Sequence, residues 1–277
     1  MARIEQVLRT VRQQLTDSPS AKLDAELLLR HLTGYSAAEL ITRADETLSD
    51  EHHQQFMNLV ERRKQGEPIA HIIGQRDFWT LNLLVNKHTL IPRPETELLV
   101  ELALLHIDKD SKQSVIDLGT GSGAIAIAIK KECPQCEVTA TDNSLDVLLL
   151  AQKNARANNV ALTLTQSHWF DQLGAQCYDM IISNPPYIAE ADPHLQQGDV
   201  RFEPMSALVS GEDGLDDIRQ IIRWSPVHLN ANGWLLLEHG YDQAAQVRAL
   251  MATQNFTDIE THQDLAGHDR VTLARKP

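Results

Sequence analysis

The chain has 277 residues, of which 42% are apolar and 23% are charged. This length exceeds one small core and suits two domains, and the composition is that of an ordinary globular protein. The formal net charge of −13, without a lysine- or arginine-rich run, argues against a nucleic-acid substrate, because phosphate contacts dominate that kind of binding.

The chain shows no sign of a membrane segment or a secretory route. Its apolar runs are all shorter than the roughly 20 residues that a membrane span requires. The first residues, MARIEQVLRT, lack the apolar core of a signal peptide. We therefore expect a cytoplasmic protein without membrane contacts, and we expect it to be a monomer.

Residues 1–66 have the apolar period of four helices. Gly34 is a typical end for the second helix, Ser36 with Glu39 forms a capping box for the third, and Ser49 is a cap for the fourth. We assign residues 1–72 to a small helical domain. Its residues are consistent with a bundle that serves only packing and with a substrate-docking module, and docking is our working hypothesis.

The pattern changes after residue 72. In FWTLNLLV, the apolar residues Trp79, Leu81, Leu83 and Val85 alternate, which predicts a β-hairpin linker within residues 73–92. In the following LIPRPETELLV, Pro94 and the acids after it indicate a helix start. Arg93, held between two prolines, is either a plain linker residue or a guanidinium that faces the cleft of the next domain. We favour the second interpretation and predict that Arg93 binds substrate.

Strands and helices alternate from residue 114 onward. SVIDL, EVTATD, LTLTQS, YDMIIS and GWLLLEH read as strands, and two more strands close the chain. Helices are predicted at 123–132, at 144–158, within 213–229 and at 242–253. This order predicts an α/β domain over residues 93–277 with a mostly parallel seven-stranded sheet, in which functional loops gather at the carboxyl ends of the strands.

The cysteines and histidines do not form a metal site. Cys133 and Cys136 follow the end of a predicted helix, where the helix dipole disfavours a thiolate, so we interpret them as structural. Zinc would require a second ligand pair, and Cys177 stands alone. The twelve histidines show no ligand spacing. We therefore expect no metal.

VIDLGTGSGAIAIAI reads as a strand, a glycine-rich loop and a helix. The glycines let the backbone approach a ligand, and Asp117 before the loop favours a cationic ligand over a pyrophosphate. Asp142 ends the next strand, where a carboxylate can accept hydrogen bonds from a ribose diol, although it is also placed to cap the following helix. S-adenosyl-L-methionine has adenosine, a ribose and a positive centre but no phosphates. The spacing resembles motif I of the class I methyltransferases, which have a Rossmann-like fold.

Asn184-Pro185-Pro186-Tyr187 interrupts the chain directly after the strand YDMIIS. Two prolines end a strand and make the backbone rigid. The tetrapeptide matches the [N/D]-P-P-[Y/F] motif of methyltransferases that modify planar nitrogens. An amide nitrogen is a poor nucleophile because its lone pair is delocalised. The Asn184 side-chain oxygen and the Pro185 carbonyl can each accept one N–H of an NH₂ group, and Tyr187 can stack on the planar group.

Five segments occur in the order of one family, namely GEPIAHIIGQRDFW, LIPRPETE, DLGTGSGAIAIA, SNPPYI and VRFEPMSAL with GEDGLD. Together they resemble the HemK/PrmC family of peptide chain release factor glutamine methyltransferases over nearly the whole chain. The resemblance implies methyl transfer from S-adenosyl-L-methionine to N5 of the glutamine in the Gly-Gly-Gln loop of release factors, with S-adenosyl-L-homocysteine as product. It also implies cofactor contacts along the glycine loop and at three further positions, and a glutamine held by the Asn-Pro-Pro-Tyr turn. The predicted cofactor residues are Asp117, Gly119, Thr120, Gly121, Ser122, Gly123, Asp142, Trp169 and Asn184; the predicted substrate residues are Asn184, Pro185, Pro186, Tyr187 and Arg93, of which Asn184, Pro185 and Tyr187 are the predicted catalytic residues.

The chain departs from the family at position 168, where His168 replaces the usual Asp before Trp169. A neutral imidazole still offers one acceptor, so we expect cofactor binding to survive. Arg201, Glu203 and Pro204 match a family segment, and they either shape the peptide site or hold the loop. Three other functions stay open: a methyltransferase for an exocyclic amine of nucleic acid, a glutamine methyltransferase for a ribosomal protein, and a cofactor-binding module without activity.

Overall fold

The computed structural model describes residues 3–108 and 111–277. This part of the chain forms two compact units. The helical unit comprises the chain up to Gln75 and the segment His194–Phe202, and the sheet unit comprises Arg76–Pro193 and Glu203–Pro277. The segment 194–202 was expected in the second domain, and the expected linker at 73–92 lies mostly inside the sheet unit.

The helical unit contains the four predicted α-helices and one more α-helix. Their bounds are α1 Ile4–Gln14, α2 Ala21–Thr33, α3 Ala37–Thr42, α4 Asp50–Lys64 and the additional α5 Ile69–Ile73. Gly34 ends α2 with a φ of 73°, which L side chains rarely adopt. Ser36 and Glu39 form the predicted capping box, and the Ser49 hydroxyl accepts the His52 N–H at the start of α4.

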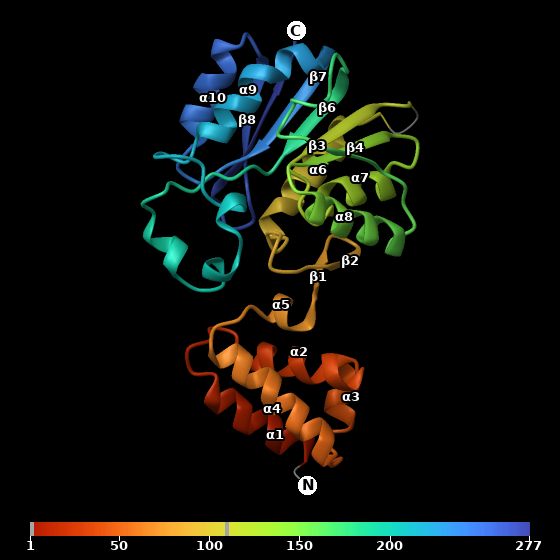
Figure 1. The fold of residues 1–277 in the computed structure, drawn as a ribbon, viewed down its shortest axis with the longest axis vertical. Coiled ribbons are helices and arrows are strands. Elements are labelled where there is room, and N and C mark those ends of the chain that lie inside the picture. The colour runs from red at the N-terminus through yellow and green to blue at the C-terminus, as the bar shows by residue number, and fades with distance from the viewer. Residues whose placement is uncertain (1–2, 109–110) are drawn as a thin grey trace. The chain divides into compact units, whose positions relative to one another are not determined.

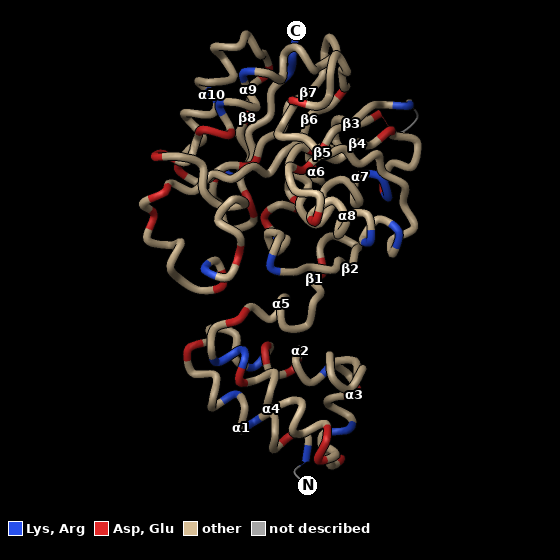
Figure 2. Tube along the Cα trace, in the orientation of Figure 1, with Lys and Arg blue, Asp and Glu red and all other residues tan. Residues whose placement is uncertain are grey.

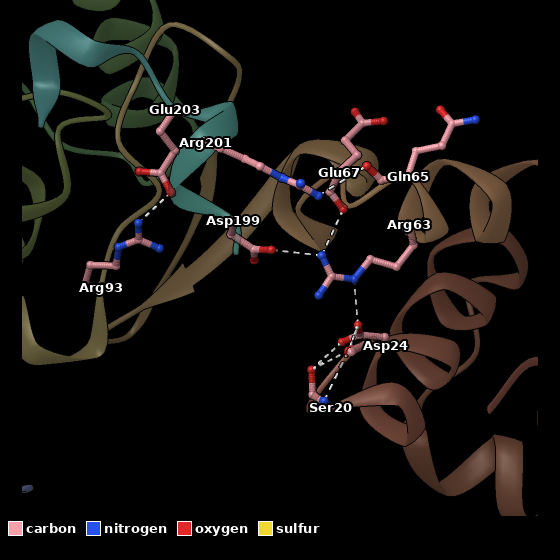
Figure 3. Close-up of polar contacts among 10 residues, drawn as sticks. Ser20, Asp24, Arg63, Gln65, Glu67, Arg93, Asp199, Arg201 and Glu203 are labelled. Atoms are coloured by element: carbon pink, nitrogen blue, oxygen red, sulfur yellow. Dashed lines mark hydrogen bonds and ion pairs between the residues drawn. The ribbon is translucent and has the colours of Figure 1, made fainter. Parts of the chain in front are cut away.

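Arg63 explains why residues 194–202 belong to the helical unit. Its guanidinium donates from Nε to Asp24 at 2.7 Å and from Nη1 to Asp199 at 2.9 Å. Nη1 also reaches the Glu67 carbonyl at 3.1 Å (Figure 3). Only 10% of the Arg63 side chain and 4% of the Asp24 side chain are exposed, so each charge depends on its partner. This ion-pair network therefore ties a loop that leaves the sheet unit to helices α2 and α4.

The sheet unit is built on seven strands in the order β5-β4-β3-β6-β7-β9-β8. Five neighbouring strands are parallel, and β9 runs antiparallel to both β7 and β8. The strands are β3 Ser114–Leu118, β4 Glu137–Asp142, β5 Thr163–Gln166, β6 Tyr178–Ser183, β7 Leu229–Glu238, β8 Thr257–Gln263 and β9 Asp269–Arg275. This arrangement confirms the predicted Rossmann-like class I methyltransferase fold. Because the chain moves in one direction from β3 to β5 and returns through β6, the order reverses between β3 and β6.

Helices cover both faces of this sheet, as Figure 1 shows. One face carries α6 Glu97–His106, α7 Ala124–Glu132 and α8 Leu145–Ala157, and the other carries α9 Asp216–His228 and α10 Ala244–Thr253. Successive residues of a strand point to opposite faces, so Val115 packs in the first core while Ile116 and Leu118 pack in the second. Burial on both faces explains why these strands read as continuous apolar runs.

The predicted linker folds as a two-stranded sheet of β1 Gln75–Phe78 and β2 Leu81–Leu84. Phe78, Leu81 and Leu83 are buried in the same core as α6 and α7. The hairpin is therefore part of the sheet unit and not a free connection.

Cys133 and Cys136 lie at the end of α7 and are buried. Burial raises the pKa of the Cys136 thiol to about 11, which opposes thiolate chemistry. Among residues 3–108 and 111–277, the helices are all too short or too polar to cross a membrane.

Candidate functional site

A cavity of about 490 Å³ opens at the carboxyl ends of the parallel strands in the sheet unit. Its volume lies in the range of roughly 300–1,000 Å³ that small-molecule sites occupy. The lining includes Gly119–Ser122 after β3, Asp142 after β4 and Asn184 after β6. These three strands adjoin one another in the sheet, and β3 and β6 flank the point where the strand order reverses, which is the place that open α/β sheets use for ligands.

The glycine loop follows β3 with a tight, left-handed backbone. Gly119, Gly121 and Gly123 have φ angles of 70°, 55° and 86°. A Cβ on Gly119 would lie 3.3 Å from the Trp169 ring, and one on Gly123 would lie 2.9 Å from the Ile127 side chain. The loop therefore needs glycine for both its conformation and its space. Gly123 does not line the cavity but permits the close packing of α7.

Asp117 lies below the loop, outside the cavity lining. It is fully buried, and its Oδ2 accepts the Thr120 hydroxyl at 2.6 Å and the Ala126 N–H at 3.3 Å. Its Oδ1 has no hydrogen-bond partner among the described residues. Burial raises the pKa of Asp117 to about 7. The position of this carboxyl supports the loop from beneath, and a direct cofactor contact stays a prediction.

Asp142 lines the cavity at the end of β4. Its Oδ2 accepts the Gly121 N–H at 3.2 Å and its Oδ1 accepts the Ser144 N–H at 3.0 Å. Burial raises the pKa of this carboxyl above its ordinary value. Each carboxylate oxygen has a second lone pair, so Asp142 can still accept hydrogen bonds from a diol.

Trp169 lies across the loop from Gly119 and lines the same cavity. Its ring nitrogen donates to Asp217 Oδ1 at 3.1 Å, which holds the indole in place. His168 also lines the cavity, with about half of its side chain exposed. Sequence reasoning missed Asp217, because an acid in the first turn of a helix ordinarily signals only a favourable helix start.

The Asn-Pro-Pro-Tyr turn begins directly after β6. Asn184 and Pro186 line the cavity, Pro185 is buried, and Tyr187 is half-buried outside the lining. The Asn184 Nδ2 donates to the Thr96 hydroxyl at 3.0 Å. The Tyr187 hydroxyl donates to Glu238 Oε1 at 3.2 Å. The turn is thus held from behind by a threonine of the LIPRPETE segment and by an acid at the end of β7.

Neither Thr96 nor Glu238 was singled out from the sequence. Thr96 lies within a motif that was quoted for its prolines and arginine. Glu238 ends an apolar strand at the same edge of the sheet as Asn184, and a carboxylate in that position is a usable signal. Arg93 lines the cavity as expected, and its guanidinium forms an ion pair with Glu203, whose side chain is fully buried (Figure 3).

The residues present fit S-adenosyl-L-methionine. Arg93 is the only lysine or arginine among the described residues of the lining, and its charge is paired with Glu203. The acids Asp142 and Asp217 line the cavity, and the unpartnered Oδ1 of Asp117 lies beneath it. A cavity with this excess of negative charge favours a cationic ligand. Fold and site together define a class I methyltransferase that uses S-adenosyl-L-methionine.

Comparisons with known proteins agree with this class. Residues 6–74 match the family model of the PrmC N-terminal domain, and residues 95–200 match the methyltransferase small domain. The chain is 50% identical over 257 residues to the release factor glutamine methyltransferase of Xylella fastidiosa strain Temecula1, covering 92% of this chain and 94% of that one. It is also 50% identical over 265 residues to the protein of the same name from Pseudomonas aeruginosa, covering 95% of each.

A solved methyltransferase from Pyrococcus furiosus shares the fold, with a TM-score of 0.55 at 17% identity over 79% of this chain and 97% of that one. The chain belongs to the release factor glutamine methyltransferase family. The resemblance to the HemK/PrmC family that the sequence motifs indicated is thereby confirmed.

Proposed function

We propose that this enzyme transfers a methyl group from S-adenosyl-L-methionine to N5 of the glutamine in the Gly-Gly-Gln motif of peptide chain release factors. One observation supports this most directly. Asn184 lines the cavity beside the glycine loop, and its Nδ2 is held by Thr96, so its side-chain oxygen is left to accept from a substrate NH₂ group. Family membership supports a release factor as the methyl acceptor, because the two relatives described above are release factor glutamine methyltransferases.

Three groups of the turn position the glutamine side chain: two hydrogen-bond acceptors and one aromatic ring. The Asn184 oxygen and the Pro185 carbonyl each accept one N–H of the glutamine side chain, which holds the nitrogen and favours its pyramidal form. Bound S-adenosyl-L-methionine supplies the electrophilic methyl group. The nitrogen becomes acidic once methylated, so its extra proton passes to water without a strong base. Because prolines make the turn rigid, the acceptors are in place before the substrate arrives.

The predicted cofactor roles rest on where these residues lie around the cavity. Gly119–Ser122 offer backbone groups to the cofactor, Asp142 accepts from the ribose hydroxyls, and Trp169 packs beside the adenosine. Arg93, paired with Glu203, borders the entry of the peptide. Tyr187 stacks on the glutamine amide and excludes water.

A nucleic-acid amine remains the main alternative acceptor, and the charges oppose it. Figure 2 shows acids spread over both units. The most basic run, Arg62-Arg63-Lys64 at the end of α4, is neutralised internally, since Arg62 pairs with Glu67, Arg63 with Asp24 and Asp199, and Lys64 with Glu61. Cations that are already paired release few counterions on binding phosphate. Methylation of a glutamine in a ribosomal protein would use the same catalytic residues. Only an assay distinguishes that acceptor from a release factor.

The helical unit, assigned over residues 1–72 and extended by 194–202, is our candidate for docking the release factor. The enzyme is proposed to act as a monomer. Because release factors act in translation, we expect the enzyme to act in the cytoplasm.

The test mixes the enzyme with labelled S-adenosyl-L-methionine and purified release factors, then maps the label by mass spectrometry. We expect label on the Gly-Gly-Gln glutamine, and none when that glutamine is changed to glutamate, which lacks the NH₂ group. Ribosomal proteins, tRNA and DNA serve as competing acceptors. Label on one of these, with unlabelled release factors, would overturn the proposal.

A further inference from the structure

A buried carboxylate lies directly behind the acceptor turn. Glu238 ends β7, one residue beyond the Leu237 that pairs with Ser183 of β6, and only 1% of it is exposed. Its Oε1 accepts the Tyr187 hydroxyl at 3.2 Å. The Thr96 hydroxyl is close enough to the carboxylate to lower the pKa of Glu238, and Oε2 of this carboxylate has no hydrogen-bond partner among the described residues. A buried acid is costly, so its retention beside two residues of the site calls for a physical role.

The hydrogen bonds from Asn184 through Thr96 to Glu238 have a fixed order of donors and acceptors. A carboxylate can only accept, so a Thr96 hydroxyl that turns toward the unpartnered Oε2 of Glu238 donates its proton there and keeps its lone pairs for another donor. That donor is the Asn184 side chain, which approaches the Thr96 oxygen at 3.0 Å. Only the nitrogen of an amide can donate, so Nδ2 must face Thr96 and Oδ1 must face away from it. The charge on Glu238 thereby selects which end of the Asn184 amide meets the substrate.

We propose that Glu238 is a positioning residue of the methyl-transfer site, which orients the Asn184 amide through the Thr96 hydroxyl and holds the Tyr187 ring through its own hydroxyl. This inference rests on the proposed function, because it assigns the Asn184 oxygen to the acceptor NH₂ group. Glu238 itself touches neither substrate nor cofactor. It acts on two residues of the turn from the side opposite to the cavity.

The surroundings of Glu238 make this relay sensitive to pH. Burial raises its pKa to about 7, the positive charge of Arg270 and the hydroxyls of Thr96 and Tyr187 oppose that rise, and the charge of Glu95 adds to it. Burial and the neighbouring Glu238 raise the pKa of Tyr187, so its hydroxyl stays protonated, although Arg270 and Arg93 act in the other direction.

Burial lowers the pKa of the neighbouring His239. Protonated Glu238 can itself donate to Thr96, and the amide orientation is then no longer imposed. Turnover should therefore rise as the pH increases through about 7.

The first experiment compares wild type with Glu238→Gln, which keeps the shape and removes the charge. Methyl transfer to a release factor is measured from pH 6 to 8.5 at saturating S-adenosyl-L-methionine. We expect kcat to fall at least about 10-fold in the variant, as for a lost hydrogen bond to a charged group, with little change in the cofactor Kd. The rise of wild-type kcat through neutral pH should flatten in the variant, whereas any contribution from Asp117 stays equal in both proteins.

Thr96 provides the matched pair of variants. Thr96→Val removes the hydroxyl without changing the shape, and Thr96→Ser returns a hydroxyl. We expect Thr96→Val to lose kcat as Glu238→Gln does, and Thr96→Ser to recover most of that loss. Because both residues act on Asn184 in series, the double variant Thr96→Val with Glu238→Gln should be little worse than either single one.

A third measurement does not depend on activity. The Asn184 side-chain NH₂ resonances, assigned by comparison with Asn184→Ala, should shift with pH in wild type as Glu238 ionises, and should shift clearly less in Glu238→Gln. Thermal unfolding of each variant reports whether it folds, and the Thr96 variants carry the test if Glu238→Gln does not.

The outcomes separate the two proposals. Wild type that leaves release factors unlabelled overturns the proposed function. Wild type that labels them, with a folded Glu238→Gln of equal kcat and an unchanged pH profile, overturns the positioning role. Fully additive losses in the double variant overturn it as well.

Discussion

Asn184 and Thr96 are 88 positions apart in sequence, and the structure joins them by a hydrogen bond of 3.0 Å from Nδ2 to the threonine hydroxyl. Thr96 comes from the segment between the hairpin and α6, and Asn184 from the end of β6. The contact fixes the Asn184 amide at the wall of the cofactor cavity. It connects the LIPRPETE and SNPPYI motifs in space, which gives a physical reason for their joint occurrence.

The first prediction concerns Asn184→Ala. Removing the side-chain oxygen takes away one of two acceptors for the glutamine NH₂, so kcat should fall by about 10²- to 10³-fold, as when one preorganised polar partner of a transition state is lost. Radiolabel transfer to a release factor measures this loss. Asn82→Ala, at an exposed position of β2, serves as a control with wild-type rates. A folded Asn184→Ala protein with normal turnover would contradict the mechanism.

Asp142→Ala should weaken binding of the cofactor. The variant loses the carboxylate proposed to accept from the ribose, together with its bonds to the Gly121 and Ser144 amides. We expect the Kd for S-adenosyl-L-homocysteine to rise on the order of 10- to 100-fold, which calorimetry would measure. Asp171→Ala, an exposed acid outside the cavity lining, controls for the change in net charge. An unchanged Kd in Asp142→Ala would remove Asp142 from the cofactor site.

Asp117 should make the stability of the ligand-free enzyme depend on pH. Its pKa is about 7 in the folded chain and 3.8 in the reference state, so the folded state binds the proton more tightly. The free energy of unfolding should therefore fall as the pH rises between about 4 and 7, by on the order of a few kcal/mol, because the buried carboxyl must ionise.

Urea unfolding of wild type and Asp117→Asn across that range checks this expectation. Glu238 adds a fall of the same sign, since burial also raises its pKa to about 7. Asp117→Asn should therefore lose less stability than wild type but should not become independent of pH. Parallel stability curves for the two proteins would show that Asp117 does not titrate as described.

Arg63→Met tests the link between segment 194–202 and the helical bundle. Removing the guanidinium leaves Asp24 buried without its ion pair, which should destabilise the helical unit by about 3–5 kcal/mol. Hydrogen exchange should increase in residues 194–202, because Asp199 loses its partner. Adding Asp24→Asn should restore part of the stability, and Lys64→Ala, which removes an exposed ion pair, should change little. Unchanged exchange in 194–202 would show that other contacts hold the segment.

The elements of the sheet unit were predictable because their signals are local. Strands buried on both faces are continuous apolar runs, α7 begins at the glycine loop, and α8 begins at the Ser144 cap. The predicted helix at 144–158 is α8 at 145–157, and the predicted helix at 123–132 is α7 at 124–132. Positive φ angles at Gly119 and Gly34 follow from their places at a loop and a helix end.

The short helix α5 was missed because five residues present too little period to recognise. The place of segment 194–202 was missed for a different reason. Nothing in its own residues predicts packing on the helical unit, because the decisive partner, Arg63, is 136 positions from Asp199.

The sequence by itself determined the order of strands and helices, the glycine loop, the Asn-Pro-Pro-Tyr turn and the family, since each is encoded by neighbouring residues. Only the tertiary structure decided that Asp117 lies beneath the loop, that Thr96 holds Asn184, and that Glu238 lies behind Tyr187. Such contacts join residues from strands and loops far apart in the chain. Hydrogen-bond partners and burial emerge only once the sheet brings their carboxyl ends together.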